Sequence, residues 1–185
     1  MNLSIIRRIV TGHNEQGAAV IAMDGAPPKV IELKAVPGTV FQEIWNTNAA
    51  PAPIDNGDDP TLRPLQLHPT PQGSIIRIVD IPPDSVQDNV SAADVAAGFA
   101  QIGAAGASTH KADARHKLMH RTETIDYGVL LAGEIWLVLD EGETKLSPGD
   151  VVIQRGTNHA WSNRTNEPAR MLFILLDGKF AEGIV

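Results

Sequence analysis

The sequence contains no cysteine, so it offers neither disulfide bonds nor thiolate metal ligands. Basic residues are also few: 15 Lys and Arg stand against 22 Asp and Glu, and the formal net charge is -7. Nucleic acids and anionic membranes both require clustered basic residues, so we expect neither as a partner. No apolar run approaches the ~20 residues of a membrane span, and the first residues hold too short an apolar segment for a secretory leader. We therefore predict a cytoplasmic protein.

The chain has 185 residues, of which 43% are hydrophobic, and can bury one full core. We predict a single domain over residues 1–185. Residues 1–104 are expected to supply N-terminal strands and a proline-rich arm. The strand-rich segment of about residues 105–178 carries the motifs discussed below.

Short apolar runs alternate with turn residues in the N-terminal half, which indicates β-strands. The expected strands span residues 5–10, 18–23, 30–33, 40–45 and 75–81. Residues 46–73 differ, because they hold six prolines among Asp and Gly residues. A loop of this length in a compact domain is usually functional or mobile, so we expect a lid or an arm that crosses a partner subunit.

One short helix is predicted after this region. Ser91 is a suitable N-cap with Asp94 three residues further on, and Val95, Phe99 and Ile102 follow at helical spacing. Gly103 ends the pattern. The helix should therefore bury a single apolar stripe.

The C-terminal segment reads as consecutive antiparallel strands, because its turns are too short for parallel crossovers. The expected strands span residues 127–132, 134–140, 151–154, 159–163 and 171–176. We expect the first two to form a hairpin that turns at Gly133. Pro148 and Gly149 match the two central positions of a type II turn.

Polar side chains fall on one face of these strands. Because side chains alternate along a strand, His120, Thr122, Thr124 and Asp126 should share a face. In the later strand, His159, Trp161 and Asn163 should do the same. Two imidazoles and a carboxylate would then converge in an apolar cup, which is typical of a ligand or metal pocket.

The order of these residues resembles the two motifs of the cupin superfamily, G-x5-H-x-H-x3,4-E-x6-G and G-x5-P-x-G-x2-H-x3-N. His120, Asp126 and Gly133 match the first motif, with Asp in place of Glu. The second motif is matched by Gly149, Gly156, His159 and Asn163. The chain departs from the family at Ala114, Thr122 and Gln154, where the motifs have Gly, His and Pro. The resemblance implies an all-β fold, a cupin (double-stranded β-helix, jelly-roll-like) barrel, here with N-terminal extra strands and one short helix.

The resemblance also implies a divalent metal, namely iron, manganese, nickel or zinc. Its ligands would be His120, Asp126 and His159, and His116 could replace the histidine that is missing at Thr122. His159 and His120 are the candidate catalytic residues. Six further residues are candidates for substrate binding: Thr122, Thr124, Tyr127, Arg155, Trp161 and Asn163.

Two functional hypotheses follow. In the first, the chain is a metal-dependent enzyme of oxygenase, decarboxylase, isomerase or cyclase type that converts a small organic molecule. In the alternative, it is a metal-free small-molecule-binding protein or lyase whose neutral histidine acts as general base. In both cases, exposed strand edges and the proline-rich arm lead us to expect a homodimer.

Overall fold

The computed structural model describes residues 3–111 and 113–184. Strands dominate these residues, as the alternating pattern predicted. The elements in chain order are β1 (Arg8–His13), β2 (Ala19–Gly25), β3 (Val30–Glu32), β4 (Val40–Thr47), β5 (Ser74–Ile81), the 3-10 helix η1 (Asp84–Gln87), α1 (Ala92–Gln101), β6 (Thr124–Ala132), β7 (Ile135–Leu139), β8 (Glu143–Leu146), β9 (Val151–Arg155), β10 (His159–Ser162) and β11 (Ala169–Asp177).

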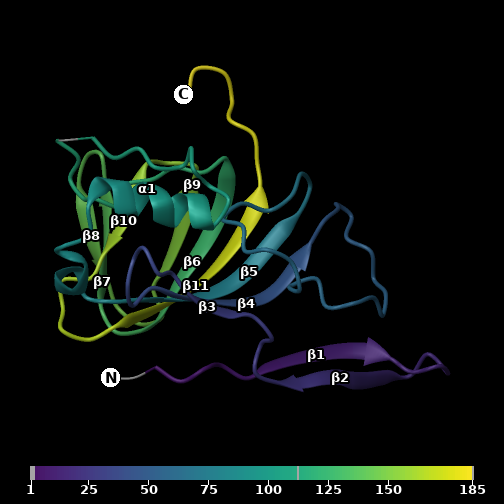
Figure 1. Ribbon diagram of the computed structural model, residues 1–185. Helices are drawn as coiled ribbons and strands as arrows, with labels where there is room; N and C mark the ends of the chain where they lie inside the picture. The colour runs from purple at the N-terminus through teal and green to yellow at the C-terminus, as the bar shows by residue number, and fades with distance from the viewer. Residues whose placement is uncertain (1–2, 112, 185) are drawn as a thin grey trace.

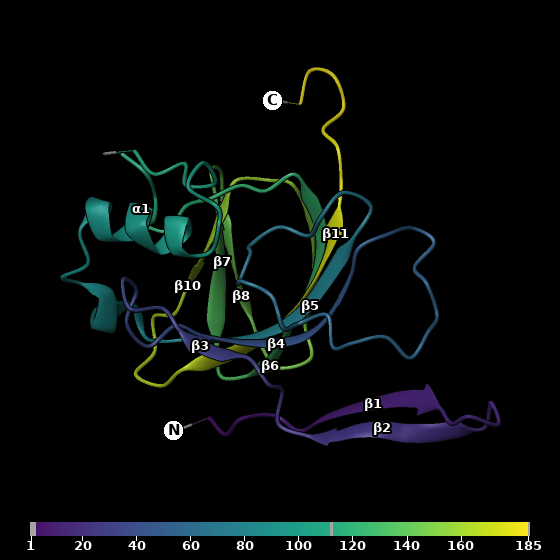
Figure 2. The same cartoon turned by 45° about the vertical axis from the view of Figure 1, so that its right-hand side comes forward.

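Two antiparallel sheets form the barrel (Figure 1). The larger sheet has the strand order β3-β4-β5-β11-β6-β9, and the smaller has the order β10-β7-β8. Helix α1 lies outside the strands on one side of the barrel, which is clearest after rotation (Figure 2). This is the all-β barrel with one short helix that the sequence predicted. No helix in the described part of the chain has the length and apolar character needed to cross a membrane.

The expected hairpin between residues 127–132 and 134–140 is wrong. Strand β6 pairs with β11 and β9, whereas β7 pairs with β10 and β8 in the other sheet. Gly133, with φ of +83°, turns the chain from one sheet to the other, and a Cβ there would lie 2.8 Å from the Cα of Ala169. Sequence neighbours can therefore diverge at a barrel corner. The sequence pattern also missed β8, because three of its four residues are exposed and polar.

The main core lies between the two sheets. Leu130 of β6, Ile135 of β7 and Met171 of β11 are completely buried there. Their side chains come from both sheets, so the core joins the two layers. Burial of this kind is the main source of the barrel's stability, at about 25 cal/mol per Å² of apolar surface.

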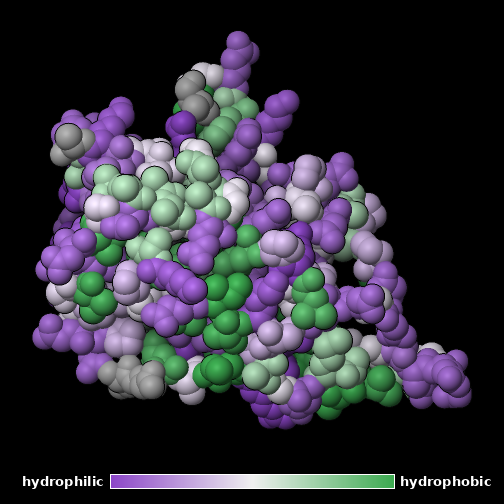
Figure 3. All heavy atoms as spheres, in the orientation of Figure 1, coloured by the Kyte–Doolittle hydropathy of each residue, from purple (hydrophilic) through white to green (hydrophobic). Residues whose placement is uncertain are grey.

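Strands β1 and β2 form a separate hairpin that extends beside the barrel (Figure 1). Apolar side chains remain on its surface (Figure 3), including Ile21, which is 65% exposed. The first strand was predicted at residues 5–10 but runs over Arg8–His13, because the backbone pairing continues through the expected turn at Thr11 and Gly12. The second strand likewise extends through Asp24 and Gly25.

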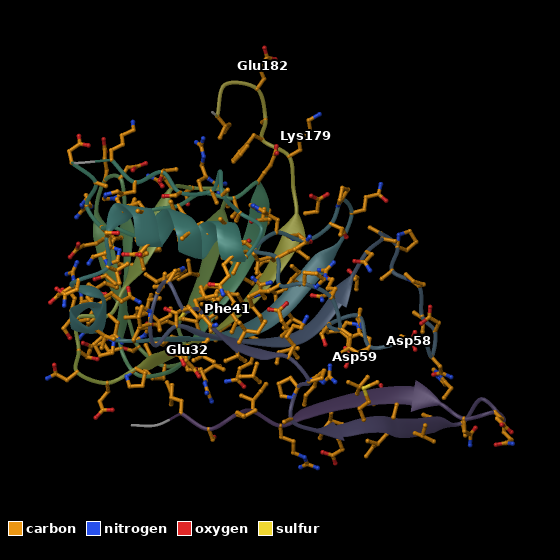
Figure 4. All side chains as sticks on the ribbon, in the orientation of Figure 1. Glu32, Phe41, Asp58, Asp59, Lys179 and Glu182 are labelled. Carbon is orange, nitrogen blue, oxygen red and sulfur yellow. The ribbon has the colours of Figure 1, made fainter. Side chains whose placement is uncertain are left out.

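The long loop was predicted at residues 46–73; β4 extends through Thr47, and residues 48–73 between β4 and β5 contain no helix or strand. Part of it is tied to the hairpin, near the position of Asp59 in Figure 4. Asp59 accepts a 2.5 Å hydrogen bond from Arg8, and both side chains are buried. At the end of β1, the side chain of Asn56 accepts a hydrogen bond from the backbone N–H of His13 at 2.9 Å and donates one to its carbonyl oxygen at 2.8 Å. The loop therefore fixes the hairpin by polar contacts.

Helix α1 begins with the capping box that the sequence predicted. The Ser91 hydroxyl accepts from the Asp94 backbone N–H, and the Asp94 carboxylate accepts from the Ser91 backbone N–H. Gly98 faces Val36, and a Cβ at Gly98 would lie 2.8 Å from Val36 Cγ2. The glycine thus allows the helix to pack closely on the segment after β3.

Candidate functional site

A cavity of about 140 Å³ lies between the two sheets and α1. Most of its lining is apolar. Phe41, labelled in Figure 4, projects into this space from β4, and Phe99 and Ile102 contribute from the α1 side. The polar lining residues are Thr39, Arg77, Gln87, His120, Thr122, Asp126 and His159. A mainly apolar cavity with a few convergent polar groups is the usual form of a small-molecule site.

His120 and His159 lie side by side in the cavity wall. An antiparallel bridge joins them, with two backbone hydrogen bonds of 2.9 Å between the two residues. Their ring centroids are 4.3 Å apart. The rings are therefore neighbours because the backbone of β10 pairs with the segment that precedes β6.

Each imidazole is oriented by a backbone carbonyl. Nδ1 of His120 lies 2.9 Å from the Leu118 carbonyl oxygen, and Nδ1 of His159 lies 2.9 Å from that of Thr157. A carbonyl oxygen can only accept, so both Nδ1 atoms carry the proton. In the neutral rings, Nε2 of both histidines is then left as an acceptor.

Burial keeps these imidazoles neutral. It lowers the pKa of His159 well below its usual value, and the neighbouring His120 lowers that pKa further. Burial likewise lowers the pKa of His120, although its bond to the Leu118 carbonyl opposes the change. At neutral pH the site therefore presents two uncharged bases.

Asp126 contributes a carboxyl group from β6. Its side chain is buried, and burial raises its pKa to about 6, against the opposing effects of the Thr124 hydroxyl and the Arg77 guanidinium. Oδ1 has no hydrogen-bond partner among the described residues. An unpaired buried oxygen is costly and is usually explained by a function or by a bound molecule.

A buried ion pair that the sequence pattern did not predict places Arg77 in the cavity wall. Arg77 of β5 pairs with Glu43 of β4 at 2.9 Å, and both side chains are almost fully buried. Burial lowers the pKa of Arg77 and raises that of Glu43, while each charge opposes the change in the other. An arginine within the otherwise apolar residues 75–79 of β5 was the only available signal, and its partner on β4 could not be read from the sequence.

Comparison with known proteins agrees with this architecture. The cupin domain family model matches residues 107–175. Over 184 residues the chain is 30% identical to the cupin-domain-containing oxidoreductase fogC of Aspergillus ruber, with 95% of this chain and 74% of the relative covered. This chain belongs to the cupin family.

Two further similarities were found for this cupin. Phomopsin biosynthesis cluster protein C' of Diaporthe leptostromiformis is 33% identical over 180 residues, which cover 93% of this chain and 78% of the relative. Among solved structures, the cupin domain of Schizosaccharomyces pombe Cnp3 has a TM-score of 0.44 and 10% identity, with 92% of this chain and 87% of that one covered.

The structure brings only some of the predicted site residues together. Thr122 and Trp161 line the cavity of this cupin beside the two histidines and Asp126. Thr124 does not line it, but its hydroxyl lies 2.7 Å from that of Thr122. Strand alternation thus predicted the shared polar face of these residues, although β6 itself begins only at Thr124.

Other predicted residues lie outside the cavity. Arg155 and Tyr127 are exposed, because the alternation of β9 and β6 turns them outward. Asn163 is fully buried, and its amide group donates to the carbonyls of Ile81 and Glu167, so it holds the turn before β11. Asn163 and Gly133 match the family motifs, but they support the backbone and do not line the cavity.

His116 also lies away from the pair. Its Nε2 atom lies 3.5 Å from Asp84 at the start of η1, and its Nδ1 accepts from the Leu118 backbone N–H. Within residues 3–111 and 113–184, no group of three or more His, Asp or Glu side chains is arranged to hold a metal ion. The described residues therefore do not form the complete ligand set that the family motif implies. His120 and His159 remain as a two-histidine donor pair.

Proposed function

We propose that this cupin converts a small, largely apolar organic molecule in its cavity, with His120 and His159 as the reacting groups. The observation that carries the proposal is the pair of neutral imidazoles, each fixed through Nδ1 by a backbone carbonyl. Names of the relatives, a cupin-domain-containing oxidoreductase and a biosynthesis cluster protein, support a role in small-molecule conversion.

The pair is suited to moving protons. An unprotonated Nε2 in an apolar cavity can accept a proton from a bound molecule, and the resulting imidazolium can return that proton at another atom. Burial disfavours the charged ring, so the proton is returned readily. General acid–base groups of this type contribute about 10²- to 10⁴-fold to a rate.

A second candidate is a metal-dependent reaction. In metal sites, a histidine ligand usually donates its other ring N–H to a carbonyl or carboxylate, as both rings do here. His120 and His159 would supply two ligands to iron, manganese, nickel or zinc, which would bring Lewis-acid or redox chemistry when bound. Since the described residues provide no third ligand, acid–base chemistry has the better support.

The test is conversion of a panel of small, apolar alcohols, phenols and carbonyl compounds, followed by mass spectrometry. We expect His159→Ala to lower turnover by at least about 100-fold. His13→Ala is the matched control, because His13 is exposed on the hairpin, far from the cavity lining. Equal turnover by wild type and a folded His159→Ala variant would refute the proposal.

A chelator separates the two candidates. Turnover that is unchanged after treatment with EDTA supports proton transfer by the imidazoles alone. Turnover that is lost with EDTA and restored by one added cation supports the metal-dependent candidate. The His159→Ala variant should then also lose binding of that cation in calorimetry.

A further inference from the structure

A second polar anchor lies in the cavity apart from the histidine pair. Asp126 is only 7% exposed and lines the cavity, yet its Oδ1 atom has no partner among the described residues. A buried carboxylate oxygen can accept hydrogen bonds but, when ionised, cannot donate them. It therefore requires a donor, from a water molecule or from a ligand.

The neighbouring protein groups satisfy this carboxyl group only in part. The charge of Arg77 acts on Asp126, but its guanidinium is committed to Glu43 and to the Gln66 and Leu67 carbonyls. The hydroxyls of Thr122 and Thr124 lie 2.7 Å apart and share one hydrogen bond, and the Thr124 hydroxyl also acts on the Asp126 carboxyl group and lowers its pKa. Oδ1 itself is enclosed, so a molecule in the cavity meets the carboxyl group of Asp126 on the side that lines the cavity.

The rest of the lining determines what kind of molecule fits. Aromatic surface comes from Phe41, Phe99, Trp161 and Phe173, and nine of the other lining residues are Leu, Val or Ile. The volume of about 140 Å³ is similar to that of an engineered apolar cavity of ~150 Å³ that admits benzene. A molecule with one six-membered ring is therefore close to the largest that the cavity can hold unless α1 moves.

The charged residues of the cavity wall further limit the kinds of molecule that can bind. An anionic acid would meet the carboxylate of Asp126, and a cationic amine, although attracted to that carboxylate, would lie beside the guanidinium of Arg77, whose charge Glu43 already balances. Both would also lose their hydration in an apolar cavity. A neutral hydroxyl group donates one hydrogen bond without either penalty.

From this geometry we infer that Asp126 anchors the hydroxyl group of a small, uncharged phenol or cyclic alcohol, whose apolar body lies against the aromatic lining. The inference rests on the proposed function, because it assigns the class of molecule that the histidine pair acts on. It also gives Asp126 a role in recognition, distinct from that of a metal ligand.

Phenol and toluene form a matched pair of probes, because a hydroxyl in one replaces a methyl group in the other. Dissociation constants are measured by NMR titration for the wild type, Asp126→Leu and Asp58→Leu. The Asp58 control removes a carboxylate from the exposed loop, outside the cavity (Figure 4). No turnover is needed, so failure of this experiment is distinct from failure of the proposed function.

We expect the wild type to prefer phenol. The preference should fall by at least about tenfold in Asp126→Leu, because a hydrogen bond to a charged group is lost, and should persist in Asp58→Leu. Equal affinity for both probes in the wild type, or an unchanged preference in Asp126→Leu, would overturn the inference.

A second measurement covers the case in which Asp126→Leu does not fold. In wild-type protein with ¹³C-labelled aspartate, phenol should shift the carboxyl signal of Asp126, and toluene should leave it nearly unchanged. Equal shifts with both probes, or no shift with phenol, would also overturn the inference.

Discussion

The barrel and the β1–β2 hairpin are both built from apolar strand sequences, but they are stabilised differently. In the barrel, Leu130, Ile135 and Met171 are completely buried between two sheets. In the hairpin, Ile9 and Ile21 remain more than half exposed. Apolar alternation therefore produces strands in both regions, whereas burial depends on a second layer that only the barrel has.

Polar contacts replace a core in the hairpin. The buried Arg8–Asp59 pair and the bonds between Asn56 and His13 join it to the loop that precedes β5. A two-stranded hairpin alone is marginally stable in water. We therefore expect the hairpin to open locally at a lower free energy than the barrel, without unfolding the cavity.

The largest expected effect comes from a substitution in the core of the barrel, with a matched substitution in the hairpin as the reference. Ile135→Ala removes a fully buried side chain and should lower the free energy of unfolding by roughly 2–5 kcal/mol. Ile21→Ala, at a position that is 65% exposed, should change it by less than about 0.5 kcal/mol. Urea unfolding measures both. Similar losses for the two variants would mean that the hairpin is as well packed as the barrel.

An intermediate effect concerns the charge inside the barrel. The pKa of Asp126 is raised from 3.8 to about 6 in the folded protein, so the unfolded chain loses its proton first as the pH rises. Stability contributed by this group is therefore full below about pH 4 and is lost between about pH 4 and 6. At about 1.4 kcal/mol per pKa unit, the loss amounts to roughly 3 kcal/mol.

Asp126→Asn should abolish that loss. The stability of the variant relative to wild type should improve by up to roughly 3 kcal/mol from pH 4 to pH 7, measured by urea unfolding at intervals of one pH unit. Asp58→Asn on the exposed loop is the control and should follow the wild type. Parallel pH curves for Asp126→Asn and wild type would contradict the raised pKa.

The smallest effect should appear in the hairpin alone. Asn56→Ala removes two hydrogen bonds to the backbone of His13 and should lower the local opening free energy there by about 1 kcal/mol. Amide hydrogen exchange at His13 should quicken by roughly fivefold, while exchange at Leu130 in β6 should not change. Faster exchange at both sites would show that the two regions unfold together.

Much of the fold could be predicted from the sequence, because turn residues and apolar alternation are local signals. The capping box at Ser91 and Asp94, the strand over residues 151–154 and the loop after β4 are confirmed. The pairing of β6 with β11 could not be predicted, since strand order depends on contacts between distant segments. Local signals also placed the first strand too early, because they do not report where backbone pairing ends.

The candidate site was predictable to a similar extent. His120, Thr122, Asp126, His159 and Trp161 were found from strand alternation and motif spacing, and all of them line the cavity. The Glu43–Arg77 pair and the contribution of α1 were missed, because both arise only when separate elements are assembled. Each belongs to a region that carries no part of the family motifs.

Helix α1 packs closely on Val36 because Gly98 has no side chain, and both residues line the cavity. The residue at position 98 therefore affects the size of the cavity. Because a Cβ at Gly98 would lie 2.8 Å from Val36 Cγ2, any larger side chain there would force the helix or the Val36 side chain to shift. Position 98 belongs to the helix, whereas the imidazole pair is held by β10 and by the segment that precedes β6. If the proposed function holds, the size of the accepted molecule and the proton transfer would depend on separate positions, so selectivity could be redesigned without altering the imidazole pair.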